Sequence, residues 1–180
     1  MVDPTGTRQA TGGERKNLDR VFGAQMAIVP VYNFPISRSV SFPYEIDFAS
    51  KVYSQDFSKT RDSAQMATYW HEQYHVFEMS IGHKSWTSMA SEQLKAGFKP
   101  KIYRWDDSKD FNSQTFEARA AAFGGCMSGS GCSRLEGMSI SGRGTNLSFK
   151  NGEFTLTQER TGSRIPERTT FKPEDLELKK

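Results

Sequence analysis

The sequence predicts a single α+β domain, and three observations predict it. Residues 21–57 contain several short β-prone pieces interrupted by prolines. Residues 60–125 show the apolar spacing of amphipathic helices, with glycines where the helices are expected to stop. Residues 137–158 alternate apolar and polar side chains around an Asn-Gly pair, the strongest short signal for a β-hairpin. A chain of 180 residues is long enough for one ordinary hydrophobic core.

The domain boundaries are predicted from composition. Residues 1–20 are polar and contain glycine without a hydrophobic period, which indicates a flexible lead-in. Residues 166–180 mix acidic and basic side chains and are expected to form a polar tail. The segment between them, residues 21–165, is expected to fold as one domain.

Three helices are expected in the middle of the chain. The first is expected between a cap at Asp62 or Ser63 and a stop at Gly82, the second within residues 86–97, and the third from a cap at Asn112 or Ser113 to a stop at Gly124 and Gly125. The first helix carries a wide apolar stripe suited to a core, made of Met66, Trp70, Tyr74, Phe77 and Ile81. Residues 151–152, Asn-Gly, are expected to form the turn of the late hairpin.

Charge and hydropathy argue against two classes of partner. The chain has 24 basic and 21 acidic residues, a net charge of +3, whereas nucleic-acid binding favours a concentrated basic surface. No apolar run approaches the length of about 18 residues that a membrane span needs. The first residues lack the apolar core of a secretory signal. We therefore expect no nucleic-acid partner, no membrane partner and no export signal.

The two cysteines, Cys126 and Cys132, lie in a glycine-rich stretch. They are expected either to form a disulfide in an oxidising compartment or to remain free thiols, and the sequence leaves both states open. Their spacing is not that of a zinc knuckle.

The strongest chemical signal is His71-Glu72-x-x-His75, which uses two of the three histidines in the chain. Histidines at positions i and i+4 of a helix lie on one face, where both rings can reach one zinc ion. Glu72 points beside that face, so it is expected to accept a proton from a metal-activated water rather than to bind the metal. The alternative hypothesis is a chance match in an amphipathic helix.

A catalytic zinc usually has three protein ligands, and Glu117 is the leading candidate for the third. It lies among alanines on the third expected helix, and such small side chains allow two helices to approach closely. The alternative for Glu117 is that it pairs with Arg119 or Arg104 on an ordinary alanine-rich helix. His83 is the second candidate for the third ligand. Glu78 and Asp107 are weaker candidates. The metzincin extension is excluded, because that pattern requires glycine at 78 and histidine at 81, where this chain has Glu78 and Ile81.

The segments "WHEQYHVF" and "FEARAAAFG" together resemble the zincin metallopeptidases of the gluzincin type. The resemblance implies a compact zincin-like fold with one helix carrying the HExxH motif and a second helix supplying a glutamate. It implies that His71, His75 and Glu117 bind Zn²⁺ and that Glu72 is the general base and later the proton donor. The substrate would be a protein or peptide. Such enzymes usually add a Tyr or His that steadies the oxyanion, for which Tyr74, His83 and Tyr103 are the candidates.

A second resemblance concerns context. The segment "VDPTG" at residues 2–6 is similar to the Asp-Pro-x-Gly junction that precedes the variable toxin domains of RHS-repeat proteins. It implies a bacterial toxin effector delivered by a secretion system into a target cell, with an immunity protein as partner. Two other functions are kept as alternatives: a zinc hydrolase acting on peptidoglycan peptides, and a non-catalytic metal-binding interaction module.

Overall fold

The computed structural model describes residues 7–8, 11–23, 31–34, 40–42, 45–49, 63–83, 86–95, 104–160 and 162–176. The helices there are α1 (Gly12–Phe22), α3 (Ser63–Ser80), α4 (Trp86–Lys95) and α5 (Phe116–Met127). The strands are β1 (Thr7–Arg8), β2 (Val31–Phe34), β3 (Val40–Phe42), β4 (Glu45–Ala49), β5 (Ser139–Gly142), β6 (Thr145–Lys150), β7 (Glu153–Gln158) and β8 (Glu167–Phe171). The fold is therefore α+β, as the sequence predicts.

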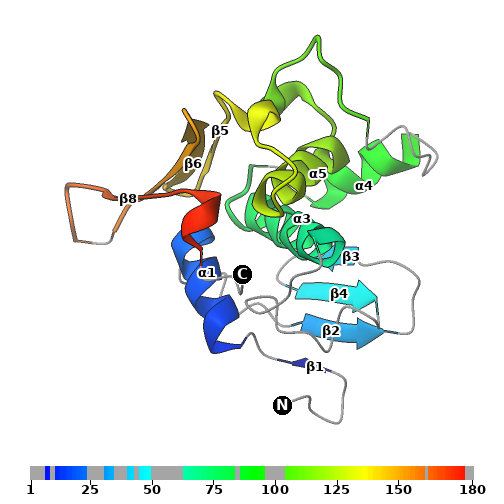
Figure 1. Ribbon diagram of the computed structural model, residues 1–180, viewed down its shortest axis with the longest axis horizontal. Coiled ribbons are helices and arrows are strands. Elements are labelled where there is room, and N and C mark those ends of the chain that lie inside the picture. The colour runs from blue at the N-terminus through cyan, green and yellow to red at the C-terminus, as the bar shows by residue number, and fades with distance from the viewer. Residues whose placement is uncertain are drawn as a thin grey trace.

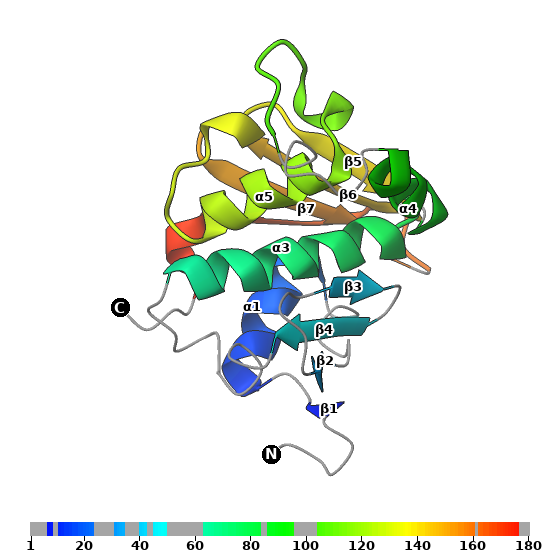
Figure 2. The same cartoon turned by 90° about the vertical axis from the view of Figure 1, so that its right-hand side faces the viewer.

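The strands form two sheets with the long helices between them (Figures 1 and 2). Sheet A has the order β1-β2-β4-β3, in which β2 and β4 are parallel and the other two pairs are antiparallel. Sheet B has the order β5-β6-β7-β8 and is antiparallel throughout. Figure 2 shows α3 and α5 side by side, with β3 and β4 of sheet A below α3 and sheet B beyond α5.

Helix α3 forms the centre of the molecule, and its apolar stripe is buried as predicted. All five stripe residues are at most 8% exposed: Met66, Trp70, Tyr74, Phe77 and Ile81. Phe123 of α5 packs against Trp70 and Tyr74, with ring centroids 6.4 and 5.0 Å away. Because aromatic side chains bury a large apolar area, this cluster holds the two helices together.

The expected hairpin is confirmed. Asn151 and Gly152 form the turn between β6 and β7, and both have positive φ angles, 53° and 80°. An Asn-Gly pair suits such a turn because both residues tolerate the left-handed region. Phe154 of β7 is fully buried and packs 5.8 Å from the ring of Phe123, which joins sheet B to the helices.

Two segments differ from the expectations. Residues 12–20 of the expected flexible lead-in belong to α1. This helix begins with a capping box, in which the side chains of Thr11 and Glu14 each accept a hydrogen bond from the other residue's backbone N–H. Leu18, Val21 and Phe22 of this helix are buried in the core, so the segment has an apolar face that the sequence analysis missed. Residues 167–171 of the expected polar tail form β8, the edge strand of sheet B.

The third helix begins and ends later than expected. Thr115 is its N-cap, where the sequence suggested Asn112 or Ser113, and the threonine side chain accepts a hydrogen bond from the Ala118 N–H. Gly124 and Gly125 lie inside α5 and do not stop it. Among the described residues, no helix is both long enough and apolar enough to cross a membrane.

Candidate metal centre

Helix α3 directs two imidazoles to the same point. The Nε2 atoms of His71 and His75 are 3.1 Å apart, and the two rings are nearly perpendicular, with an interplanar angle of 79°. This geometry is what positions i and i+4 of a helix provide. The burial of the apolar stripe on the same helix fixes the rotation of α3, so both rings are held on one side.

Helix α5 brings a carboxylate to these nitrogens. Glu117 lies 46 residues from His71 in the sequence, and its Oε2 atom is 3.1 Å from the His71 Nε2. Its other oxygen, Oε1, is 2.9 Å from the His75 Nε2. Within the described part of the chain, His71, His75 and Glu117 form the one group of three or more potential metal ligands whose ligand atoms all lie within 4.8 Å of one another.

Small residues allow α5 to come this close. A Cβ atom at Gly124 would lie only 2.5 Å from the backbone oxygen of Ala67 and 3.3 Å from the backbone nitrogen of His71. Glycine is therefore required there, because any side chain would push α5 away from α3. Ala118 and Ala120 are also buried, at 2% and 0% exposure.

Each imidazole Nε2 atom of the cluster faces more than one polar partner. An imidazole Nε2 carries either one hydrogen or one lone pair, so it can make one good hydrogen bond. Here each Nε2 faces two partners, the other imidazole and the carboxylate. Two imidazole nitrogens and both oxygens of one carboxylate converge on one point, which is the arrangement that a cation stabilises.

The cluster is largely buried, and its members shift one another's pKa values. Burial alone would raise the pKa of Glu117, but hydrogen bonds from His71 and His75 hold that pKa far below its usual range. Burial alone would lower the pKa of His75, but the carboxylate of Glu117, with a smaller contribution from Glu72, raises it. In the absence of a metal, the group thus favours a charged carboxylate and a protonated imidazole.

Glu72 lies next to the cluster without joining it. It is 7% exposed, and its negative charge is one of those that raise the pKa of His75.

The other candidates for the third ligand lie elsewhere or do not join the group. The carboxylate of Glu78 forms a buried ion pair with Arg119, so Glu117 does not pair with that arginine. His83 follows the end of α3 and is not among the three clustered side chains. Asp107 lines a separate pocket.

Tyr74 is one of the residues expected to steady the oxyanion. Its ring packs against Phe123, and the pKa of its hydroxyl is raised, first by burial and then by the charge of Glu78.

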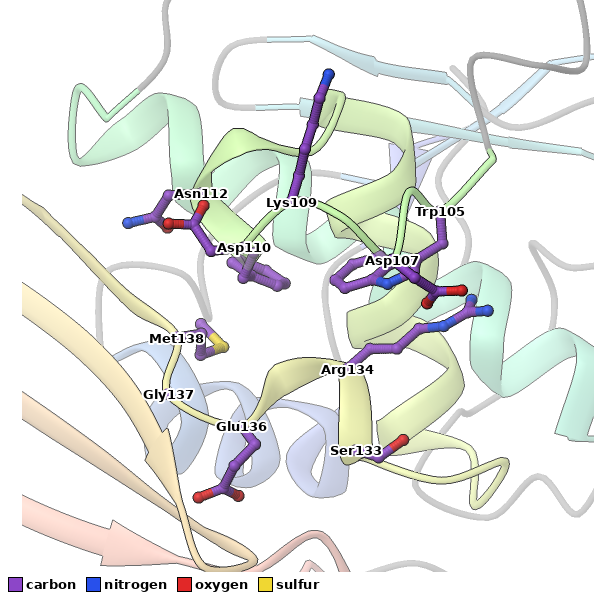
Figure 3. Close-up of a pocket in the computed structure, with 11 residues that line it drawn as sticks. Trp105, Asp107, Lys109, Asp110, Asn112, Ser133, Arg134, Glu136, Gly137 and Met138 are labelled. Carbon is purple, nitrogen blue, oxygen red and sulfur yellow. The ribbon is translucent and has the colours of Figure 1, made fainter.

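The pocket that Asp107 lines has a volume of about 360 Å³, and its other lining residues lie mainly within 105–112 and 133–138 (Figure 3). The guanidinium of Arg134 lies over the ring of Trp105, 5.3 Å from its centroid. None of the three clustered side chains lines this pocket.

Two expectations concern residues outside the described part of the chain: Tyr103 and the Asp-Pro-Thr-Gly run at 3–6.

Cys126 and Cys132 form a disulfide, which settles the two states left open by the sequence. It links Cys126 in the last turn of α5 to Cys132 in the loop that follows, at the opposite end of the helix from Glu117.

Comparison with known proteins finds no protein-family model, no curated protein and no solved structure that matches the chain.

Proposed function

We propose that the protein is a zinc-dependent metallopeptidase of the gluzincin type, with His71, His75 and Glu117 as zinc ligands. The observation that carries the proposal is the convergence of the two Nε2 atoms and both Glu117 oxygens within 3.1 Å of their neighbours. Two ligand atoms each about 2.0–2.1 Å from a zinc ion, at the tetrahedral angle, lie about 3.3–3.4 Å apart. The ligand atoms would therefore need to separate by only a few tenths of an ångström.

Three protein ligands leave one tetrahedral position for water, as in catalytic rather than structural zinc sites. When bound, the metal would lower the pKa of that water and polarise the substrate carbonyl. Glu72, beside the cluster on α3, would accept the proton of the attacking water and return it to the leaving amine.

The metal content of the purified protein tests the site. We expect about one zinc per chain by elemental mass spectrometry, and its loss in His71→Ala and in Glu117→Ala. The matched variant is His83→Ala, which removes the alternative third ligand and is expected to keep the metal. Loss of zinc in His83→Ala with retention in Glu117→Ala would assign the third ligand to His83.

Glu72→Gln separates catalysis from binding. We expect this variant to keep its zinc, because the side chain is not a ligand, and to lose hydrolysis of casein. If Glu72→Gln hydrolyses casein as fast as the wild type, Glu72 is not the general base. If the zinc-loaded wild type hydrolyses no peptide substrate, a zinc-binding interaction module becomes the better proposal. Hydrolysis of purified peptidoglycan peptides in place of casein would favour the cell-wall hydrolase. Two further predictions rest on the resemblance at residues 2–6: delivery of the protein as a toxin, and an immunity protein as its partner.

A further inference from the structure

A buried ion pair joins the two helices that carry the cluster. Glu78 of α3 is 0% exposed and Arg119 of α5 is 2% exposed. The Arg119 Nε atom donates to Glu78 Oε2 at 3.2 Å, and Nη2 donates to Oε1 of the same carboxylate. This is a two-point contact, in which the planar guanidinium fixes direction as well as distance.

The same guanidinium holds the segment that leads into α5. Its Nη1 atom donates to the backbone carbonyl of Gln114 at 2.6 Å. The side-chain amide of Gln114 in turn donates to the carbonyls of Asp106 and Lys109, at 2.6 and 2.9 Å. Arg119 thus fixes α5 to α3 and to its own entry segment.

This pair lies one turn beyond the cluster. Glu78 is three residues after His75 on α3, and Arg119 is two residues after Glu117 on α5. On α3, the two histidines lie between the close contact of Ala67 with Gly124 and the ion pair at Glu78. Between these contacts Ala120 of α5 is fully buried, and Phe123 packs against Trp70 and Tyr74 of α3. Apolar packing of this kind brings the helices together but is non-directional, whereas a two-point ion pair fixes direction.

We propose that Arg119 is a positioning residue, which sets the rotation of α5 so that Glu117 meets both histidines. The inference rests on the proposed zinc function. Glu117 lies in the first turn of α5, where a helix holds its own backbone least firmly. Replacing a buried ion pair by apolar side chains of similar size is often neutral for stability, so stability alone does not account for this pair. The directional contact of Arg119 supplies what packing does not.

The test compares zinc affinity and cobalt spectra in variants that keep the fold. The paired variant Glu78→Leu with Arg119→Met removes both charges, and Arg119→Lys keeps the charge but loses the two-point contact. We expect the dissociation constant for zinc, measured against a chromophoric chelator, to rise by about 10–100-fold in each. The visible spectrum of the Co²⁺-loaded protein should change as well, because it reports the ligand geometry.

Leu156→Ala in β7 is the matched control, since it opens the core at a strand of sheet B and changes no residue of α3 or α5. We expect it to lower the melting temperature while leaving zinc affinity and the cobalt spectrum unchanged. Wild-type zinc affinity and spectrum in a folded paired variant, or in folded Arg119→Lys, would overturn the positioning role. The positioning role would also be overturned if the loss of zinc affinity followed the loss of melting temperature in every variant, including the Leu156→Ala control. A wild-type protein that takes up no zinc would instead overturn the zinc function, and the positioning role with it.

Discussion

Replacing Gly124 by alanine should destabilise the protein even though alanine favours helices. The new Cβ would lie 2.5 Å from the Ala67 carbonyl oxygen, whereas ordinary contact begins at about 3.4 Å. Helix α5 would therefore have to move by about 0.9 Å, because the atoms it meets belong to the backbone and cannot turn away. Such overpacking costs about 1–3 kcal/mol.

Gly125→Ala is the matched control. A Cβ there would lie 3.9 Å from its nearest neighbour, Ser130, so nothing has to move. Both substitutions gain the same helix propensity, up to about 1 kcal/mol. The difference in unfolding free energy between the two variants therefore isolates the overpacking cost. For a chain of this size, about 1 kcal/mol corresponds to a shift of about 2–4 °C in melting temperature.

Thermal melts followed by circular dichroism measure that difference, and zinc titration adds a second readout. Metal sites tolerate ligand displacements of about 0.2 Å, so a 0.9 Å movement of α5 should also weaken zinc binding through Glu117. If Gly124→Ala melts at the same temperature as Gly125→Ala and binds zinc as the wild type does, the close approach of α3 and α5 is not what positions Glu117.

Further predictions concern pH, the disulfide and the core. The raised pKa of His75 stabilises the metal-free protein below about pH 6.5, and this stabilisation is lost as the pH rises through the raised pKa. The lowered pKa of Glu117 stabilises the metal-free protein above about pH 4.3, and this stabilisation is lost as the pH falls through the lowered pKa. Zinc requires the neutral imidazole, so melts with zinc should improve over the same rise in pH, and parallel trends with zinc and with EDTA would contradict the site. Replacing Cys126 and Cys132 by serine opens a short loop and should cost about 2 kcal/mol in urea unfolding, with zinc content unchanged. Phe154→Ala should cost about 3–5 kcal/mol, because its ring is fully buried; a loss below about 1 kcal/mol would show that sheet B is not part of the core.

Part of the fold that departs from the expectations is nevertheless encoded locally. The capping box of Thr11 and Glu14 marks the start of α1, and the spacing of Leu18, Val21 and Phe22 is that of a helix with one apolar face. The two glycines in α5 were expected to end it, because glycine is the usual residue after a helix. They are tolerated inside α5, which packs closely against α3, and Gly124 is required by that contact.

The sequence by itself determined the spacing of His71, Glu72 and His75, because helix geometry depends only on neighbours a few residues apart. It also determined the hairpin at Asn151, since the turn needs only local backbone angles. The tertiary structure decided that the carboxylate of Glu117 meets the histidines, because that requires the packing of α5 against α3 across 46 residues of sequence. It likewise decided the partner of Arg119, since a guanidinium pairs with whichever carboxylate the packed helices bring within reach, and here that is Glu78.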